Sequence, residues 1–178
     1  MQSQGNLPIL ALRQKDFYQL IGECIKAWAT VEGQLYDICA KLLKSDHNLV
    51  SVVFFRIHSI GGRRDLTDEL LTVRFPKIGG VDPPVIQAWK DIKKEIDVIL
   101  PVRNSLAHHP VKMNISPGDP GTGLTHKFES STSDKENLRG KPPRRVAEEE
   151  LKPHLEQVNA ITASLEQFLS GPFAQAQP

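Results

Sequence analysis

Apolar positions recur every three or four residues over most of the chain, a spacing typical of amphipathic helices. The first such run extends from Asp16 to Leu43 and predicts one long helix. A second apolar stretch, from Asn48 to Phe75, is interrupted by Gly61 and Gly62, so we expect two helical pieces joined near these glycines. The apolar stripe of the first helix consists of Phe17, Leu20, Ile21, Cys24, Trp28, Val31, Leu35, Ile38 and Leu42.

A third helix is predicted from Pro84 to His108, after a turn over residues 76–84 that is rich in glycine and proline. Pro101 lies inside this helix and removes the amide that would bond the carbonyl of Asp97. We therefore expect a kink just before Arg103. The stripe of this helix consists of Val85, Trp89, Ile92, Ile96, Ile99 and Leu106.

The helical period is lost after Pro110, which cannot continue a helix. Residues 111–115 and 124–129 are predicted to pair as two short strands around a turn-rich segment, with an irregular loop as the alternative. The tract 130–145 is polar and expected to be exposed. A last helix, from Glu150 to Leu169, carries the stripe Leu151, Leu155, Val158, Ile161, Leu165 and Phe168.

These helices each need to bury one stripe, so the expected fold is mainly α, a four- or five-helix antiparallel bundle. A short irregular or β-hairpin insertion, residues 110–146, precedes the last helix. The bundle domain is expected over residues 16–169, with an N-terminal extension at 1–15 and a tail at 170–178.

Composition excludes several functional classes. The chain has 178 residues, 39% hydrophobic and 24% charged, which suits one globular domain. Its net charge of +1 produces no global field for nucleic acid or membranes, so any anion binding must be local. No apolar run is long enough for a membrane span, and no signal-peptide pattern occurs in the first fifteen residues. The expected compartment is the cytoplasm.

The cysteines and histidines do not suggest a metal site. Cys24 and Cys39 are separated by roughly 22 Å of helix, too far for a disulfide, and are expected to be buried thiols. Neither has a ligand at metal-binding spacing, and the histidines at 47, 58, 126 and 154 are scattered. We expect no metal and no cofactor, and Trp28 and Trp89 are expected in the core. Nucleotide-binding and serine-hydrolase motifs do not occur in the sequence.

The segment from Arg103 to His109 combines a guanidinium, an amide and two imidazoles at the end of a helix. Arg103 is predicted to fall on the apolar stripe, four residues after Ile99, where a charge needs a partner or a function. Asn104 and His108 share one face of the helix. A second copy across a symmetric interface would complete a cleft with two of each group.

The sequence RNSLAH, residues 103–108, resembles the signature of the HEPN superfamily, and a first long helix with Trp28 and Glu32 is similar to that of many members. The resemblance implies a helical bundle that acts as a homodimeric, metal-independent endoribonuclease. It assigns His108 as general base or acid, Arg103 as phosphate clamp and Asn104 as positioning residue. The implied products are a 2′,3′-cyclic phosphate and a 5′-hydroxyl, and the implied setting is a toxin or antiphage system with RNA and an antitoxin as partners.

Accessory roles are expected for Glu32 and for His109 as a reserve base. Two sets of basic residues are candidates for tracking an RNA backbone, although solvated surface charge is the alternative. They are Arg63 and Arg64, and the cluster Arg139, Lys141, Arg144 and Arg145.

Two other interpretations of the Arg103 region stay open. One is a non-catalytic HEPN-like module that binds RNA, nucleotide or a protein partner through the same interface. The other is a purely structural bundle in which Arg103 forms an ion pair with Glu32 and His108 caps the helix.

Overall fold

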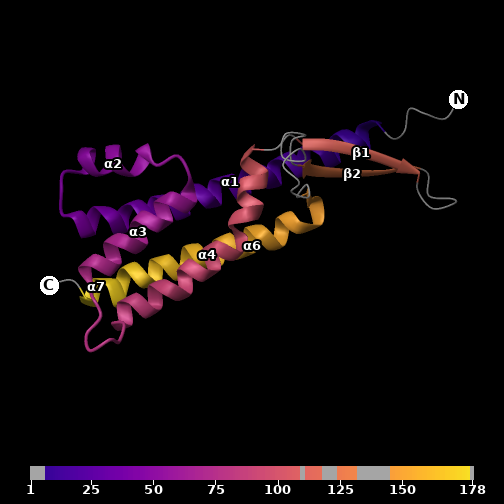
Figure 1. Cartoon of the computed structure of the whole chain (residues 1–178). Coiled ribbons are helices and arrows are strands. Elements are labelled where there is room, and N and C mark those ends of the chain that lie inside the picture. The colour runs from indigo at the N-terminus through magenta and orange to yellow at the C-terminus, as the bar shows by residue number, and fades with distance from the viewer. Residues whose placement is uncertain (1–6, 109–110, 118–123, 132–144, 177–178) are drawn as a thin grey trace, which may run out of the picture. The chain divides into compact units, whose positions relative to one another are not determined.

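The computed structural model describes residues 7–108, 111–117, 124–131 and 145–176, and it confirms a mainly helical fold (Figure 1). The strands are short and lie between the fourth and fifth helices along the chain. The helices are α1 Leu7–Leu43, α2 His47–Arg56, α3 Ile60–Arg74, α4 Pro84–His108, α6 Glu148–Ser170 and α7 Pro172–Ala176. The strands are β1 Val111–Pro117, β2 Leu124–Ser131 and β3 Arg145–Ala147.

The helix boundaries agree closely with the hydrophobic pattern in two cases and differ in two others. Helix α4 has the predicted bounds, and α6 differs from its prediction by only one or two residues at each end. Helix α1 begins at Leu7 instead of Asp16, so part of the expected extension is helical. Helix α7 lies in the expected tail. Its five residues are too few to show a helical period in the sequence.

The second and third helices are joined near Gly61 and Gly62, as predicted. The break lies at residues 57–59, just before the glycines, and both glycines belong to the first turn of α3. Ser59 decides where α3 begins, because its hydroxyl oxygen accepts a hydrogen bond from the backbone N–H of Gly62 at 3.0 Å. Asp46 caps α2 in the same way and accepts from the amide of Asn48 at 2.8 Å.

The turn between α3 and α4 is a tight reversal, as predicted. Ile78 and Val81 exchange two backbone hydrogen bonds of 3.1 Å. Gly79 and Gly80, between them, have φ values of 60° and 82°, in the left-handed region that L side chains avoid. The two glycines are therefore required by this turn.

The predicted hairpin is present, with a third strand added to it. Strands β1 and β2 pair antiparallel, with Val111 opposite Ser130 and Pro117 opposite Leu124. Strand β3 pairs antiparallel with β2 in the order β1-β2-β3. The sequence did not predict β3, because three residues cannot establish an alternating pattern.

The chain divides into two compact units. Unit 1 comprises residues 1–26 and 101–156, and unit 2 comprises 27–100 and 157–178. Helices α1, α4 and α6 contribute residues to both units, and the division within α4 falls at Pro101. Unit 1 has its own core, formed by Phe17, Cys24, Leu106, Val146 and Leu151.

Unit 2 holds the larger core. Both tryptophans are buried in it as predicted, Trp28 at 2% and Trp89 at 0% exposure. Phe168 and Phe173 stack on one another with ring centroids 5.4 Å apart. Other fully buried members of this core are Leu35, Ile38, Phe54, Ile60, Leu71, Ile96 and Leu165.

The packing at the start of α3 makes Gly62 a test of this fold. A Cβ at Gly62 would lie 2.6 Å from Cγ2 of Ile57 and 3.2 Å from the hydroxyl of Ser59. We expect Gly62→Ala to lower the free energy of unfolding by about 1–2 kcal/mol, because the clash outweighs the higher helix propensity of alanine. Urea denaturation, monitored by circular dichroism, measures this free energy for the wild type and the variant.

Gly33→Ala is the matched control. Gly33 lies in α1 of the same unit, and nothing lies within 4 Å of a Cβ placed there. This substitution is expected to stabilise by about 0.5–1 kcal/mol. Equal effects of the two changes would contradict the close packing at Ile57.

Candidate functional site

The last two turns of α4 contain the predicted site residues, and one side of these turns is buried while the other is more exposed. Ser105 and Leu106 are buried, with 1% and 8% exposure, and Leu106 belongs to the core of unit 1. Arg103 is half-buried, while Asn104 and Ala107 are exposed. The buried side of the helix end therefore passes through Ser105 and Leu106, and the half-buried Arg103 lies about 60° from Leu106 around the axis of a regular helix.

Arg103 and Asn104 contact one another directly. Nη1 of Arg103 donates a hydrogen bond to Oδ1 of Asn104 at 3.4 Å. In a regular helix the positions 103, 107, 104 and 108 span an arc of about 140°, opposite the positions of Ser105 and Leu106. The three residues of the predicted site thus occupy one side of the helix end.

Several predicted residues lie at or beyond the limits of the described chain. His108 is the last residue of α4, and the placement of its side chain lies outside the described part. His109 and Arg144 lie outside the described residues altogether, as do Arg139 and Lys141. Arg145 begins β3, and only its backbone is described.

No known protein family, curated protein or solved structure matches this chain. The candidate site therefore depends on its own residues and geometry.

Arg63 is held by contacts within unit 2. Its guanidinium forms an ion pair with Glu32, and its Nε donates to the backbone carbonyl of Ile57 at 3.0 Å. The guanidinium also lies over the rings of Phe54 and Phe55, 5.5 and 5.1 Å from their centroids. Glu32, which the structural alternative assigns to Arg103, thus binds Arg63.

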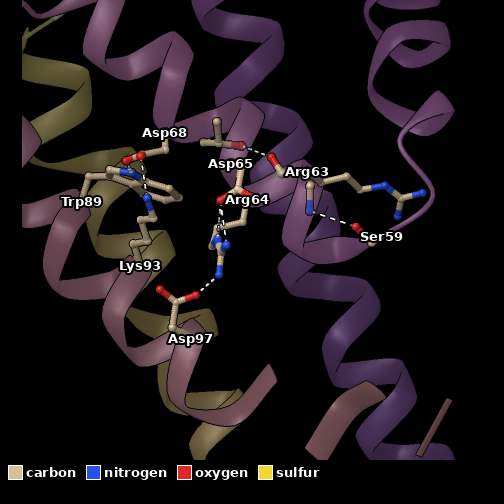
Figure 2. A network of polar contacts seen from close by, with 10 residues as sticks. Ser59, Arg63, Arg64, Asp65, Asp68, Trp89, Lys93 and Asp97 are labelled. Carbon is tan, nitrogen blue, oxygen red and sulfur yellow. Dashed lines mark hydrogen bonds and ion pairs between the residues drawn. The ribbon is translucent and has the colours of Figure 1, made fainter. Parts of the chain in front are cut away.

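Arg64 links α3 to α4. Its guanidinium points across to the carboxylate of Asp97 and also binds Oδ1 of Asp65 at 2.6 Å (Figure 2). The side chains of Arg63 and Arg64 are each only 13% exposed. Both guanidinium groups are therefore engaged in intramolecular ion pairs, a role different from the predicted contact with an RNA backbone.

Asp68 joins a neighbouring network that the sequence did not suggest. Its Oδ1 accepts a hydrogen bond from the indole Nε1 of Trp89 at 2.8 Å, and its Oδ2 binds Nζ of Lys93 at 2.5 Å (Figure 2). Burial by itself raises the pKa of Asp68, but the hydrogen bonds from Lys93 and Trp89 and the nearby positive charges outweigh it. The pKa of this carboxyl is consequently lower than its ordinary value of 3.8.

A hollow of about 610 Å³ in unit 1 has the wrong charge for a phosphate. Its lining contains three carboxylates and one ammonium group, so it repels anions on balance. Arg103 is not part of the lining. The lining residues are Asp16, Phe17, Gln19, Leu20, Glu23, Glu149 and Lys152.

The two cysteines are free and buried. Sγ of Cys24 lies 3.7 Å from the carbonyl of Leu151, and burial, with the neighbouring charge of Glu23, raises the pKa of Cys24 to about 11. Burial also raises the pKa of Cys39. Across the described residues, no three His, Cys, Asp or Glu side chains are grouped to hold a metal ion. The helices described contain no segment of the length and apolarity that crossing a membrane requires.

Asp68 should stabilise unit 2 through both of its contacts. We expect Asp68→Ala to lower the free energy of unfolding by about 1–3 kcal/mol, because it leaves the buried indole N–H of Trp89 without its acceptor. Asp68→Asn keeps an acceptor and removes the charge beside Lys93, so it should cost less. Urea unfolding at neutral pH measures both.

The contribution of Asp68 to the free energy of unfolding depends on pH in a defined direction. Because the folded pKa of Asp68 is below 3.8, its ionised form stabilises the protein above that pH, and this contribution is lost as pH falls through the folded pKa. The difference in stability between the wild type and Asp68→Asn should therefore shrink as the pH falls below 3.8. A difference that stays constant would contradict the assigned ion pair.

The raised pKa of Cys24 predicts an unreactive thiol. At pH 7 a group with a pKa of about 11 is thiolate in roughly one molecule in ten thousand, and burial restricts access further. We expect thiol reagents to label native protein more than about a hundredfold more slowly than denatured protein. Rapid labelling of one thiol under native conditions would contradict the burial of these residues.

Proposed function

We propose that the chain is a metal-independent endoribonuclease of the HEPN type, with Arg103, Asn104 and His108 as its catalytic residues. The observation that carries the proposal is the direct contact of Arg103 with Asn104 on the exposed side of the end of α4, where position 108 also falls. RNA cleavage without metal needs a group such as an imidazole to move the proton and a cation such as a guanidinium to hold the phosphate, and a neighbouring amide can position them.

The proposed reaction begins at the 2′-hydroxyl of the substrate RNA. His108 takes the proton of this hydroxyl, whose oxygen attacks the adjacent phosphorus while the bond to the 5′-oxygen breaks. The departing 5′-oxygen receives a proton from the imidazolium of His108 or from water, and the products are a 2′,3′-cyclic phosphate and a 5′-hydroxyl. Arg103 neutralises the charge that grows on the nonbridging oxygens, and Asn104 orients Arg103 or the phosphate.

A homodimer forms part of the proposal. One copy supplies one guanidinium and one imidazole, and a twofold pair of helix ends would supply two of each to a shared groove. Because Arg63 and Arg64 are engaged inside unit 2, other cations must hold the rest of the RNA. A toxin or antiphage setting, with an antitoxin as partner, belongs to the same proposal.

Cleavage of a fluorescently labelled RNA in the presence of a chelator tests this function. Wild-type protein is expected to cleave, and His108→Ala to lose about 10²–10⁴-fold in rate, because the proton acceptor is gone. Arg103→Lys keeps the charge but not the bidentate geometry, so we expect a loss of about 10²–10³-fold. Mass spectrometry of the products should find the cyclic phosphate.

His58→Ala is the matched control for the imidazole, since His58 is exposed between α2 and α3 in unit 2. It should cleave as the wild type does. RNA binding without cleavage by the wild type would contradict the enzyme and indicate a non-catalytic RNA-binding module. The absence of both activities would favour a structural role for Arg103.

A further inference from the structure

Helix α2 has an apolar face on each side, and only one of them is covered. Val50 and Phe54 are buried in the core of unit 2. Leu49, Val52 and Val53 lie on the other side with 63%, 60% and 51% exposure. Their spacing of three and four residues forms a continuous stripe along a helix of ten residues.

The ends of this stripe carry opposite charges. Asp46, the N-cap of α2, is exposed, and so is Arg56, the last residue of the helix. Arg56 follows Leu49 and Val52 on the same side of the helix, at positions seven and four residues later. The stripe is therefore negative at one end, apolar in the middle and positive at the other end.

We propose that the exposed stripe of α2 (Leu49, Val52 and Val53) binds the same stripe of a second copy of this chain, with the two helices antiparallel. In a pair related by a twofold axis beside Val52 and Val53, these two residues cover their counterparts, and Leu49 lies level with the aliphatic part of Arg56 of the other copy. Asp46 of each copy then comes within reach of the partner's Arg56, so both ends of the contact hold opposite charges. A parallel pair would instead bring like charges together.

The contact is small. Three apolar side chains per copy are far fewer than the roughly 20–30 residues per side of a standard interface, so the dimer should be reversible and depend on concentration. The contact uses unit 2 alone, whereas the proposed ribonuclease residues belong to unit 1. It does not depend on the proposed function.

Sedimentation velocity of the full chain from about 10 μM to about 1 mM tests the proposal. The average mass of the wild type is expected to rise towards double its starting value over this range, from monomer to dimer or, if copies already pair through the end of α4, from dimer to tetramer. Val52→Glu should raise the dimer dissociation constant about tenfold or more, because it places a carboxylate in the apolar centre of the contact. Val73→Glu is the matched control, since Val73 lies in the last turn of α3 with 80% exposure and should have no effect.

Charge variants test the orientation. Arg56→Gln should weaken the dimer by about twofold to fivefold, and Asp46→Asn by a similar factor, since asparagine preserves the N-cap. Under mild oxidation Val52→Cys should cross-link, whereas Leu49→Cys should not, because the two positions 49 lie about 10 Å apart along the axis of an antiparallel pair. Circular dichroism confirms that each variant is folded.

Three results would overturn the proposal: a wild type whose average mass does not rise with concentration, an association that Val52→Glu leaves unchanged, or equal cross-linking at both positions. An unchanged dimer would point to another face, such as the end of α4, and would leave the proposed ribonuclease untouched. Loss of RNA cleavage in His108→Ala would likewise say nothing about α2.

Discussion

The burial of one side of α4 is the constraint on which the candidate site depends. Ser105 and Leu106 face the core of unit 1, and the helical repeat then leaves the opposite side to Arg103, Asn104 and position 108. Because the helix is rigid, the burial of Leu106 also determines which neighbouring positions lie on the opposite side of the helix. The division between the units at Pro101 gives this last part of α4 its own packing environment.

Arginines lie in two different environments in this chain. Arg63 and Arg64 lie in α3, where carboxylates of Glu32 and Asp97 from other helices bind them. Half-buried ion pairs of this kind specify how helices meet, since a misplaced partner leaves a charge without compensation. Arg103, one helix later, belongs to a more exposed segment and contacts an amide. The burial of an arginine and the groups that it contacts therefore distinguish a structural residue from a candidate catalytic residue better than the residue type does.

The sequence predicted those parts of the fold that depend on local periodicity. The bounds of α4, the turn at Gly79 and Gly80 and the β1-β2 hairpin follow from neighbours in the chain. The glycines indicated the junction but not the residue at which α3 begins, because the serine cap places both glycines inside the helix. The pairing of Asp68 with Trp89 joins residues 21 positions apart, and no local pattern encodes such a contact. For the candidate site, spacing in the sequence predicts that Arg103, Asn104 and His108 lie at one helix end, whereas the hydrogen bond between Arg103 and Asn104 depends on side-chain rotamers that no sequence pattern encodes.

The distribution of the tryptophans has a practical consequence. The chain contains two, Trp28 and Trp89, and both are buried in unit 2, while unit 1 contains none. Intrinsic indole emission therefore reports the opening of unit 2 alone, whereas far-ultraviolet ellipticity sums the helices of both units. Coincident transitions in the two signals would mean that the units unfold as one cooperative block, and separated transitions that each melts by itself.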